Sequence, residues 1–150
     1  MATMSTTPTA TSLGISGTTS KSGTISWTCP TIPEGCTITS CVLTGTPTFS
    51  MTKGSATVTV NGTTVTSGTQ FTINLGTANT TKSVTTTGKG NNKNARGTIT
   101  FTSLSYVVTY EEPVTKTENI VIGTSTVQTI YLGTTEIVRV YIGDVLVYGE

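Results

Sequence analysis

Short runs of β-branched and aromatic residues, separated by turn-forming residues at intervals of roughly 8 to 12 positions, limit what this chain can fold into. About a quarter of the residues are threonine, which favours strands because its branched Cβ packs well on a pleated surface. No window carries apolar residues at a sustained helical spacing of about 3.6. The sequence therefore predicts an all-β fold: an antiparallel β-sandwich, Ig-like or jelly-roll-like, with a C-terminal β-meander.

Local signals place strands, a turn and a bulge within residues 21–112. Asn61-Gly62 predicts a two-residue type I′ hairpin turn, because both residues tolerate positive φ. Ser103-Leu104-Ser105 interrupts the alternation of the last segment, which predicts a β-bulge. Trp27, the only tryptophan, is predicted to anchor the core. The predicted strands cover residues 23–28, 37–43, 48–51, 56–60, 63–65, 70–75, 83–87 and 98–110.

The chain divides into a predicted N-terminal arm (residues 1–20), the sandwich (21–112) and a C-terminal tail (113–150). The arm has two interpretations, a flexible leader or an extended segment that orders only against a neighbouring subunit. Its sizeable apolar groups are Leu13 and Ile15, too few to offset an ordering entropy of about 1 kcal/mol or more per residue. We therefore predict that Leu13 and Ile15 contact another chain.

Beyond Pro113 the sequence repeats at ten-residue steps, with an aromatic residue or valine, an aliphatic residue and a glycine at 121–123, 131–133 and 141–143. The repeats predict short strands with turns at the three glycines. Such strands bury little area by themselves and need neighbours. Tyr131, Arg139 and Tyr141 are therefore candidate contact residues.

Charge and residue types exclude several functions. The net charge of +1 and a pI near 7.7 argue against nucleic-acid binding, and no apolar run is long enough for a membrane span. The chain has no histidine, and Glu111 and Glu112 are adjacent, so they point to opposite strand faces rather than flanking a substrate. We predict no catalytic, metal or cofactor site. The N-terminus lacks a secretory signal, so the protein is used where it is made or released by lysis, unless a signal was removed.

The three cysteines lie close together in the sequence. Cys36 and Cys41 are five positions apart and would face opposite sides of one strand. A bridge between Cys29 and Cys36 is geometrically conceivable. We expect free, partly buried thiols, since unpaired cysteine behaves as a small hydrophobe.

A polar loop at residues 88–97 is the best candidate binding surface in the sandwich. Its amide and basic side chains could hydrogen-bond a glycan or an acidic partner. The alternative is an ordinary hydrophilic hairpin loop. The candidate contact residues in this loop are Asn91, Asn92, Lys93, Asn94 and Arg96.

Residues 130–148 carry a resemblance to a known group of proteins. Their tandem pattern of aromatic, aliphatic, glycine and polar residues, closing on Val147-Tyr148, resembles the ending of structural proteins of tailed bacteriophages and prophages. The preceding Thr- and Gly-rich segment, with the closing run 106–110, is similar to the β-sandwich modules of such proteins. The group includes capsid decoration proteins, head fibres and tail appendages, and the resemblance carries over no catalytic residue.

The resemblance implies a non-enzymatic structural component of a bacteriophage virion, an accessory or decoration protein of the head or an appendage. It would assemble in the host cytoplasm, contact other virion proteins and form a homo-oligomer. One alternative is a carbohydrate-binding receptor module of a phage tail or fibre, whose partner would be a host-surface glycan. Another is a bacterial surface adhesin module.

Overall fold

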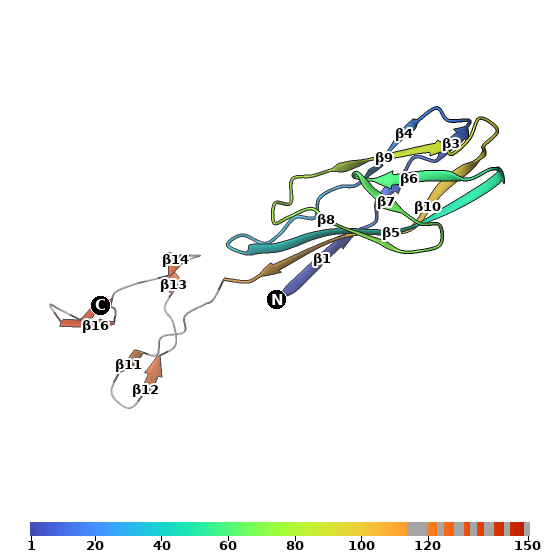
Figure 1. Cartoon of the computed structure of the whole chain (residues 1–150). Helices are drawn as coiled ribbons and strands as arrows, with labels where there is room; N and C mark the ends of the chain where they lie inside the picture. The colour runs from blue at the N-terminus through green and yellow to red at the C-terminus, as the bar shows by residue number, and fades with distance from the viewer. Residues whose placement is uncertain are drawn as a thin grey trace. The chain divides into compact units, whose positions relative to one another are not determined.

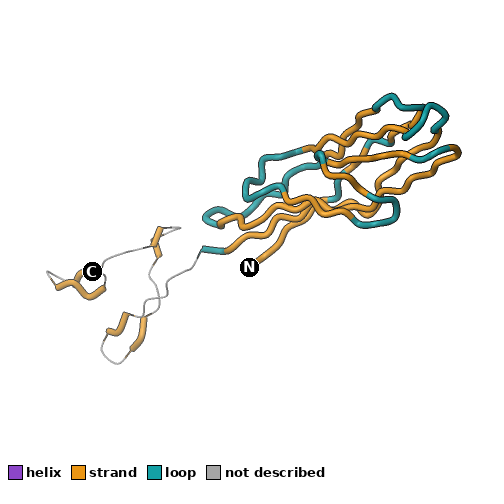
Figure 2. Tube along the Cα trace, in the orientation of Figure 1, coloured by secondary structure: helices purple, strands orange, loops and turns teal. Residues whose placement is uncertain are grey.

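The computed structural model describes residues 1–113 with their side chains and, beyond them, the backbone of residues 120–122, 125–127, 131–132, 135–136, 140–142 and 145–148. The chain divides into two compact units, Met1–Pro113 and Val114–Glu150. Every regular element of the described residues is a strand (Figure 2). The all-β prediction is confirmed, and the first unit ends one residue after the predicted sandwich boundary.

The first unit is a sandwich of two antiparallel sheets (Figure 1). The first sheet has the order β1 (Ala2–Thr6), β10 (Arg96–Glu111), β5 (Thr37–Lys53) and β8 (Phe71–Asn74), with β3 (Leu13–Ser16) also paired to β10. The second has the order β2 (Thr9–Ala10), β4 (Lys21–Ser26), β9 (Ser83–Gly90), β6 (Ala56–Val60) and β7 (Thr63–Val65).

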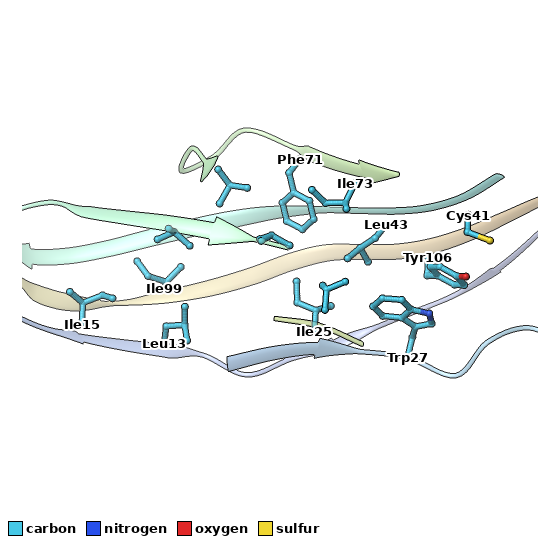
Figure 3. Packing of buried hydrophobic residues seen from close by; sticks show 14 of the residues in the cluster. Leu13, Ile15, Ile25, Trp27, Cys41, Leu43, Phe71, Ile73, Ile99 and Tyr106 are labelled. Atoms are coloured by element: carbon cyan, nitrogen blue, oxygen red, sulfur yellow. The ribbon is translucent and has the colours of Figure 1, made fainter. Parts of the chain in front are cut away.

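The core lies between the sheets and is built from alternate residues of each strand. Leu43 of β5 and Tyr106 of β10 are fully buried against Ile25 and Val58 of the opposite sheet. Trp27 is 7% exposed and stacks on Tyr106, with the ring centroids 4.7 Å apart (Figure 3). Trp27 is therefore a core residue, as predicted.

Strand β5 is one continuous strand of 17 residues, where the sequence predicted two strands separated near Pro47. The backbone carbonyl of Pro47 accepts a hydrogen bond from the Gly68 amide, so the Pro47 nitrogen faces the same side, away from β10. Strand β8 pairs with β5 only as far as Gly45. The proline therefore removes no ladder hydrogen bond, which is the condition under which a strand tolerates it.

The predicted turn and bulge are both present. Asn61 and Gly62 have φ angles of 49° and 79°, the positive values that a type I′ turn requires at both positions. The register of β10 against β5 shifts between Thr102 and Ser105, and Ser103 has a φ of 51°. The bulge leaves Leu104 over Gly45, where a Cβ would lie 2.5 Å from Leu104 Cδ2.

The prediction of a separate N-terminal arm is wrong. Strands β1 and β3 pair with the two halves of β10, and β2 pairs with β4. Leu13 and Ile15 are 2% and 3% exposed and belong to the core of their own chain. Their alternation on β3 directs both side chains between the sheets. The free energy gained by burying them adds to that of the backbone hydrogen bonds, and together these offset the ordering entropy.

Threonine and serine occupy many of the outward positions of both sheets. On the first sheet Thr46, Thr48 and Ser50 of β5 face Thr102, Thr100 and Thr98 of β10. On the second sheet, one row of paired residues crosses four strands and consists of Ser22, Thr87, Thr59 and Thr64. Rows of short hydroxyl side chains therefore run across both outer faces, which accounts for much of the threonine in the first unit.

The described strands of the second unit form three separate hairpins. The pairs are β11 (Ile120–Ile122) with β12 (Ser125–Val127), β13 (Tyr131–Leu132) with β14 (Thr135–Glu136), and β15 (Val140–Ile142) with β16 (Val145–Tyr148). In each pair, two residues of the sequence separate the strands. The connecting residues, with Gly123, Gly133 and Gly143, lie outside the described residues. The described strands thus form separate two-stranded sheets rather than the predicted continuous meander.

Candidate functional site

Three turns meet at one end of the sandwich and fix the polar loop that the sequence singled out. The loop between β9 and β10 bonds to the turn after β3, because Gly90 N donates to Gly17 O at 3.0 Å and Gly17 N donates to Ala95 O at 2.9 Å. It also bonds to the turn between β5 and β6, where Asn91 N donates to Ser55 O at 2.9 Å. The loop is therefore held in place by backbone hydrogen bonds to the other two turns.

Ala95 closes this junction. It is fully buried, and a Cβ added to Gly54 would lie 3.2 Å from the Ala95 Cβ. A Cβ at Gly90 would collide with the Ala95 Cβ and would lie 2.5 Å from Gly17 O. The close approach of three backbones explains the glycines in these turns.

The amide side chains of the loop serve it in different ways. Asn91 is fully engaged, since its Oδ1 accepts from Thr57 Oγ1 at 2.9 Å and its Nδ2 donates to Ser55 Oγ at 3.0 Å. Asn92 Oδ1 accepts from the Asn94 amide at 2.9 Å, the pattern of an Asx turn. Asn91 and Asn92 therefore shape the loop, while the exposed Asn94 side chain is the more accessible amide.

The basic residues gather at the same end, because each of the meeting elements contributes one or two. Strand pairing places Lys53 opposite Arg96, while Lys21 lies opposite Gly88 and next to Lys89 in the register. All of these side chains are exposed. We call this surface the basic end; its residues are Lys21, Lys53, Lys89, Lys93 and Arg96.

Arg96 is the best-oriented cation of the basic end. Its Nη1 donates to Ala95 O at 2.8 Å and to Lys93 O at 3.4 Å. These bonds hold the guanidinium beside the loop backbone while its remaining donors are exposed. A planar guanidinium held in this way suits a carboxylate or phosphate, which it can bind with two hydrogen bonds.

The carboxylates of the first unit lie at the opposite end. Thr37 pairs with Glu111, and Gly35 lies next to Pro113, so Glu34, Glu111 and Glu112 share that end, together with Lys82 and the N-terminus. The 17 residues of β5 separate the ends by roughly 50 Å at about 3.3 Å per residue. Because the screening length is about 8 Å in physiological salt, the two ends act independently.

The overall charge of +1 therefore conceals a separated charge distribution. No Asp or Glu occurs between residues 35 and 110, a signal that sequence reasoning could have used. The strand pairing was still needed to bring Lys21 and Lys53 beside the loop.

The remaining predicted contact residues have different outcomes. Leu13 and Ile15 are in the core and are not surface residues. Tyr131 lies in β13 opposite Glu136, and Tyr141 lies in β15 opposite Leu146. Arg139 lies outside the described residues.

A buried polar cluster lies in the half of the sandwich away from the basic end. Tyr106 Oη hydrogen-bonds Asn79 Oδ1 at 2.8 Å, and Asn79 Nδ2 donates to Pro30 O at 2.7 Å. Burial, followed by the neighbouring Cys41 thiol, raises the pKa of Tyr106 well above its ordinary value of 10.0. These bonds fasten the loops that carry Pro30 and Asn79 to the core, so the cluster has a structural role.

The three cysteines are present as thiols, as the sequence predicted. All three are free, and Cys41 is buried while Cys29 and Cys36 are half-buried. Cys29 Sγ donates to Thr81 O at 3.3 Å. Within residues 1–113 and the described tail strands, no group of three or more potential ligands is placed to hold a metal ion.

A membrane-spanning helix is not found among the residues that the structure describes.

Comparison with known proteins returned no match to a protein-family model, to a curated protein or to a solved structure.

Proposed function

We propose that this protein is a non-enzymatic structural component of a bacteriophage virion, an accessory or decoration protein of the head or of an appendage. It assembles in the host cytoplasm, packs against other virion proteins and against copies of itself, and remains in the released particle. The proposal rests on the tail, whose sequence resembles the endings of such proteins.

The observation that carries the proposal is the repetition of one hairpin three times. Each hairpin has a two-residue connection, and corresponding residues Ile122, Leu132 and Ile142 end the first strand. A single two-stranded hairpin is marginally stable in water. Three short hairpins in succession therefore favour a segment that is completed by packing against other chains.

The sandwich supports the same function in two ways. Its outer faces carry hydroxyl groups in regular rows, such as Thr59 with Thr87, whose Oγ1 atoms are 2.7 Å apart. Rows of uncharged hydroxyl groups can pack against neighbouring subunits without leaving buried charges unpaired. The basic end adds one electrostatic contact, suited to an acidic surface of another virion protein.

Glycan binding has less support from the sandwich. Sugar rings are commonly bound on exposed aromatic side chains, and among residues 1–113 the exposed large hydrophobic residue is Met1. Trp27 and Tyr106 are buried. A glycan site in this unit would depend on polar groups, such as those of the basic end, rather than on exposed aromatic rings.

The proposal is tested by locating the protein in purified particles. Antibody raised against residues 1–113 is applied to purified particles and viewed by immunogold electron microscopy. Labelling at one repeated position on intact particles is expected. Labelling only of host debris, with clean particles, would rule out the proposal.

A further inference from the structure

We propose that β1 is an exchangeable strand, which leaves β10 of its own chain and pairs in the same register with β10 of a neighbouring copy. This inference rests on the proposed assembly function and names the contact that would join the copies. Strand β1 differs from β3, the next strand along the chain on the same edge of the sheet.

Strand β1 supplies no residue to the core cluster, whereas β3 is anchored there. Leu13 and Ile15 of β3 belong to the core cluster, whereas no residue of β1 is part of it and no hydrophobic residue of β1 packs against it. The inward residues Ala2, Met4 and Thr6 are only half-buried. The buried Thr6 hydroxyl has no hydrogen-bond partner. Removal of β1 therefore takes no residue out of the core cluster.

What β1 supplies is backbone pairing, which any copy can supply. It pairs antiparallel with β10 over five positions, from Ala2 opposite Tyr110 to Thr6 opposite Tyr106. It lies at the edge of the sheet, with β10 as its neighbour. The same five residues from a second copy would restore every one of these contacts, which is the condition for exchange of an identical element.

The hinge is short and already extended. Thr7 and Pro8 separate β1 from β2, and Pro8 is buried. Proline disfavours a helical conformation in the residue before it, so Thr7 is held extended. Because β2 stays paired to β4, the change of direction is confined to Thr7 and Pro8.

The chemistry of β1 also fits a strand that pairs freely. Natural edge strands are commonly protected by lysine, proline or short length. The other edge strands β2, β7 and β8 have two to four residues, whereas β1 has five and carries neither charge nor proline. In dilute solution β1 pairs with β10 of its own chain, because the effective concentration of that partner within the chain is high. Pairing between chains becomes more favourable when copies are crowded, as they are in a particle.

The test uses cysteines placed at register partners on separate chains. Thr3 lies opposite Thr109, and opposed residues of paired strands hold their Cα atoms about 4.5 to 5.5 Å apart, within disulfide range. Full-length Thr3→Cys and Thr109→Cys variants are made in a background with Cys29→Ser and Cys36→Ser. The two are mixed at about 1 mM, an effective concentration typical of tethered partners, and oxidised mildly.

A disulfide-linked heterodimer on a non-reducing gel is expected, identified by mass spectrometry of the joined peptides. The control mixes Thr3→Cys with Thr98→Cys, because Thr98 lies on β10 opposite Gly14 of β3, beyond the reach of β1. The expected yield exceeds that of the control about tenfold, since only register partners hold the sulfurs in range.

Equal yields in the two mixtures would overturn the exchange. A double variant carrying both Thr3→Cys and Thr109→Cys in one chain checks the register. In dilute solution it should form a disulfide within the chain, whether or not β1 exchanges between chains at high concentration. Failure here leaves the particle experiment untouched, so the two proposals fail separately.

Discussion

Substitution of Gly90 by alanine tests how the three turns of the basic end are held together. The new Cβ would collide with the Ala95 Cβ and lie 2.5 Å from Gly17 O. Because Gly17 O is a backbone atom that already accepts from Gly90 N, the clash is not relieved by turning a side chain. Overpacking costs about 1 to 3 kcal/mol, and loss of the hydrogen bond costs about 1 kcal/mol more.

One contribution to the free energy of unfolding opposes this destabilisation. Alanine in place of glycine restricts the unfolded chain and recovers about 0.4 to 1 kcal/mol. The net destabilisation expected for Gly90→Ala is therefore about 1 to 3.5 kcal/mol, measured by urea unfolding at neutral pH. The matched control is Gly14→Ala, also in a strand, where a Cβ meets nothing within 4 Å. That variant should be unchanged or more stable by up to about 1 kcal/mol.

A second substitution separates the two clashes. Ala95→Gly removes the contact with the Ala95 Cβ and leaves the contact with Gly17 O. In the double variant we expect partial recovery, with a favourable coupling of about 1 kcal/mol between the two sites. If Gly90→Ala and Gly14→Ala unfold at the same urea concentration, the described packing of the three turns is wrong.

The remaining predictions concern the buried phenol, the N-terminal strands and the basic end. Because the folded pKa of Tyr106 is raised, the unfolded chain loses the phenolic proton first. Stability should then fall as pH rises above 10, by about 1 kcal/mol from pH 10 to 11; Tyr106→Phe should lack this fall in urea titrations. Leu13→Ala should cost about 2 to 5 kcal/mol because it opens a core cavity, and Met4→Ala less than about 1 kcal/mol; equal costs would contradict the assignment of β3 to the core and β1 to the periphery. Lys93→Glu should reduce incorporation into particles more than Lys82→Glu, with both variants equally stable; equal incorporation would remove the basic end from the assembly contacts.

The strand pattern of the sandwich was accessible from the sequence because local signals decide it. Asn61-Gly62 permits few backbone conformations, and the phase break at Ser103 marks a bulge wherever the strand pairs. The spans of β6 and β7 were predicted without error. The continuity of β5 through Pro47 was not accessible, because it depends on which side of the strand faces β10.

The N-terminal segment and the basic end show more clearly what could not be predicted from the sequence. The alternation of Leu13 and Ile15 is a strand signal, but two residues do not reveal that β10 has a free edge to receive them. The convergence of Lys21, Lys53 and Arg96 likewise follows from strand pairing between distant segments. Local composition predicted the fold class, while the position of each contact residue required the tertiary arrangement.

The measurement that tests the central claim most directly is the copy number of the protein in purified particles. Particles are purified by density gradient and digested, and the protein is quantified by isotope-labelled peptides against the major capsid protein. The account predicts a fixed ratio that is reproduced between preparations and is a simple multiple set by particle symmetry. A ratio that falls towards zero with each round of purification would contradict a structural role in the virion.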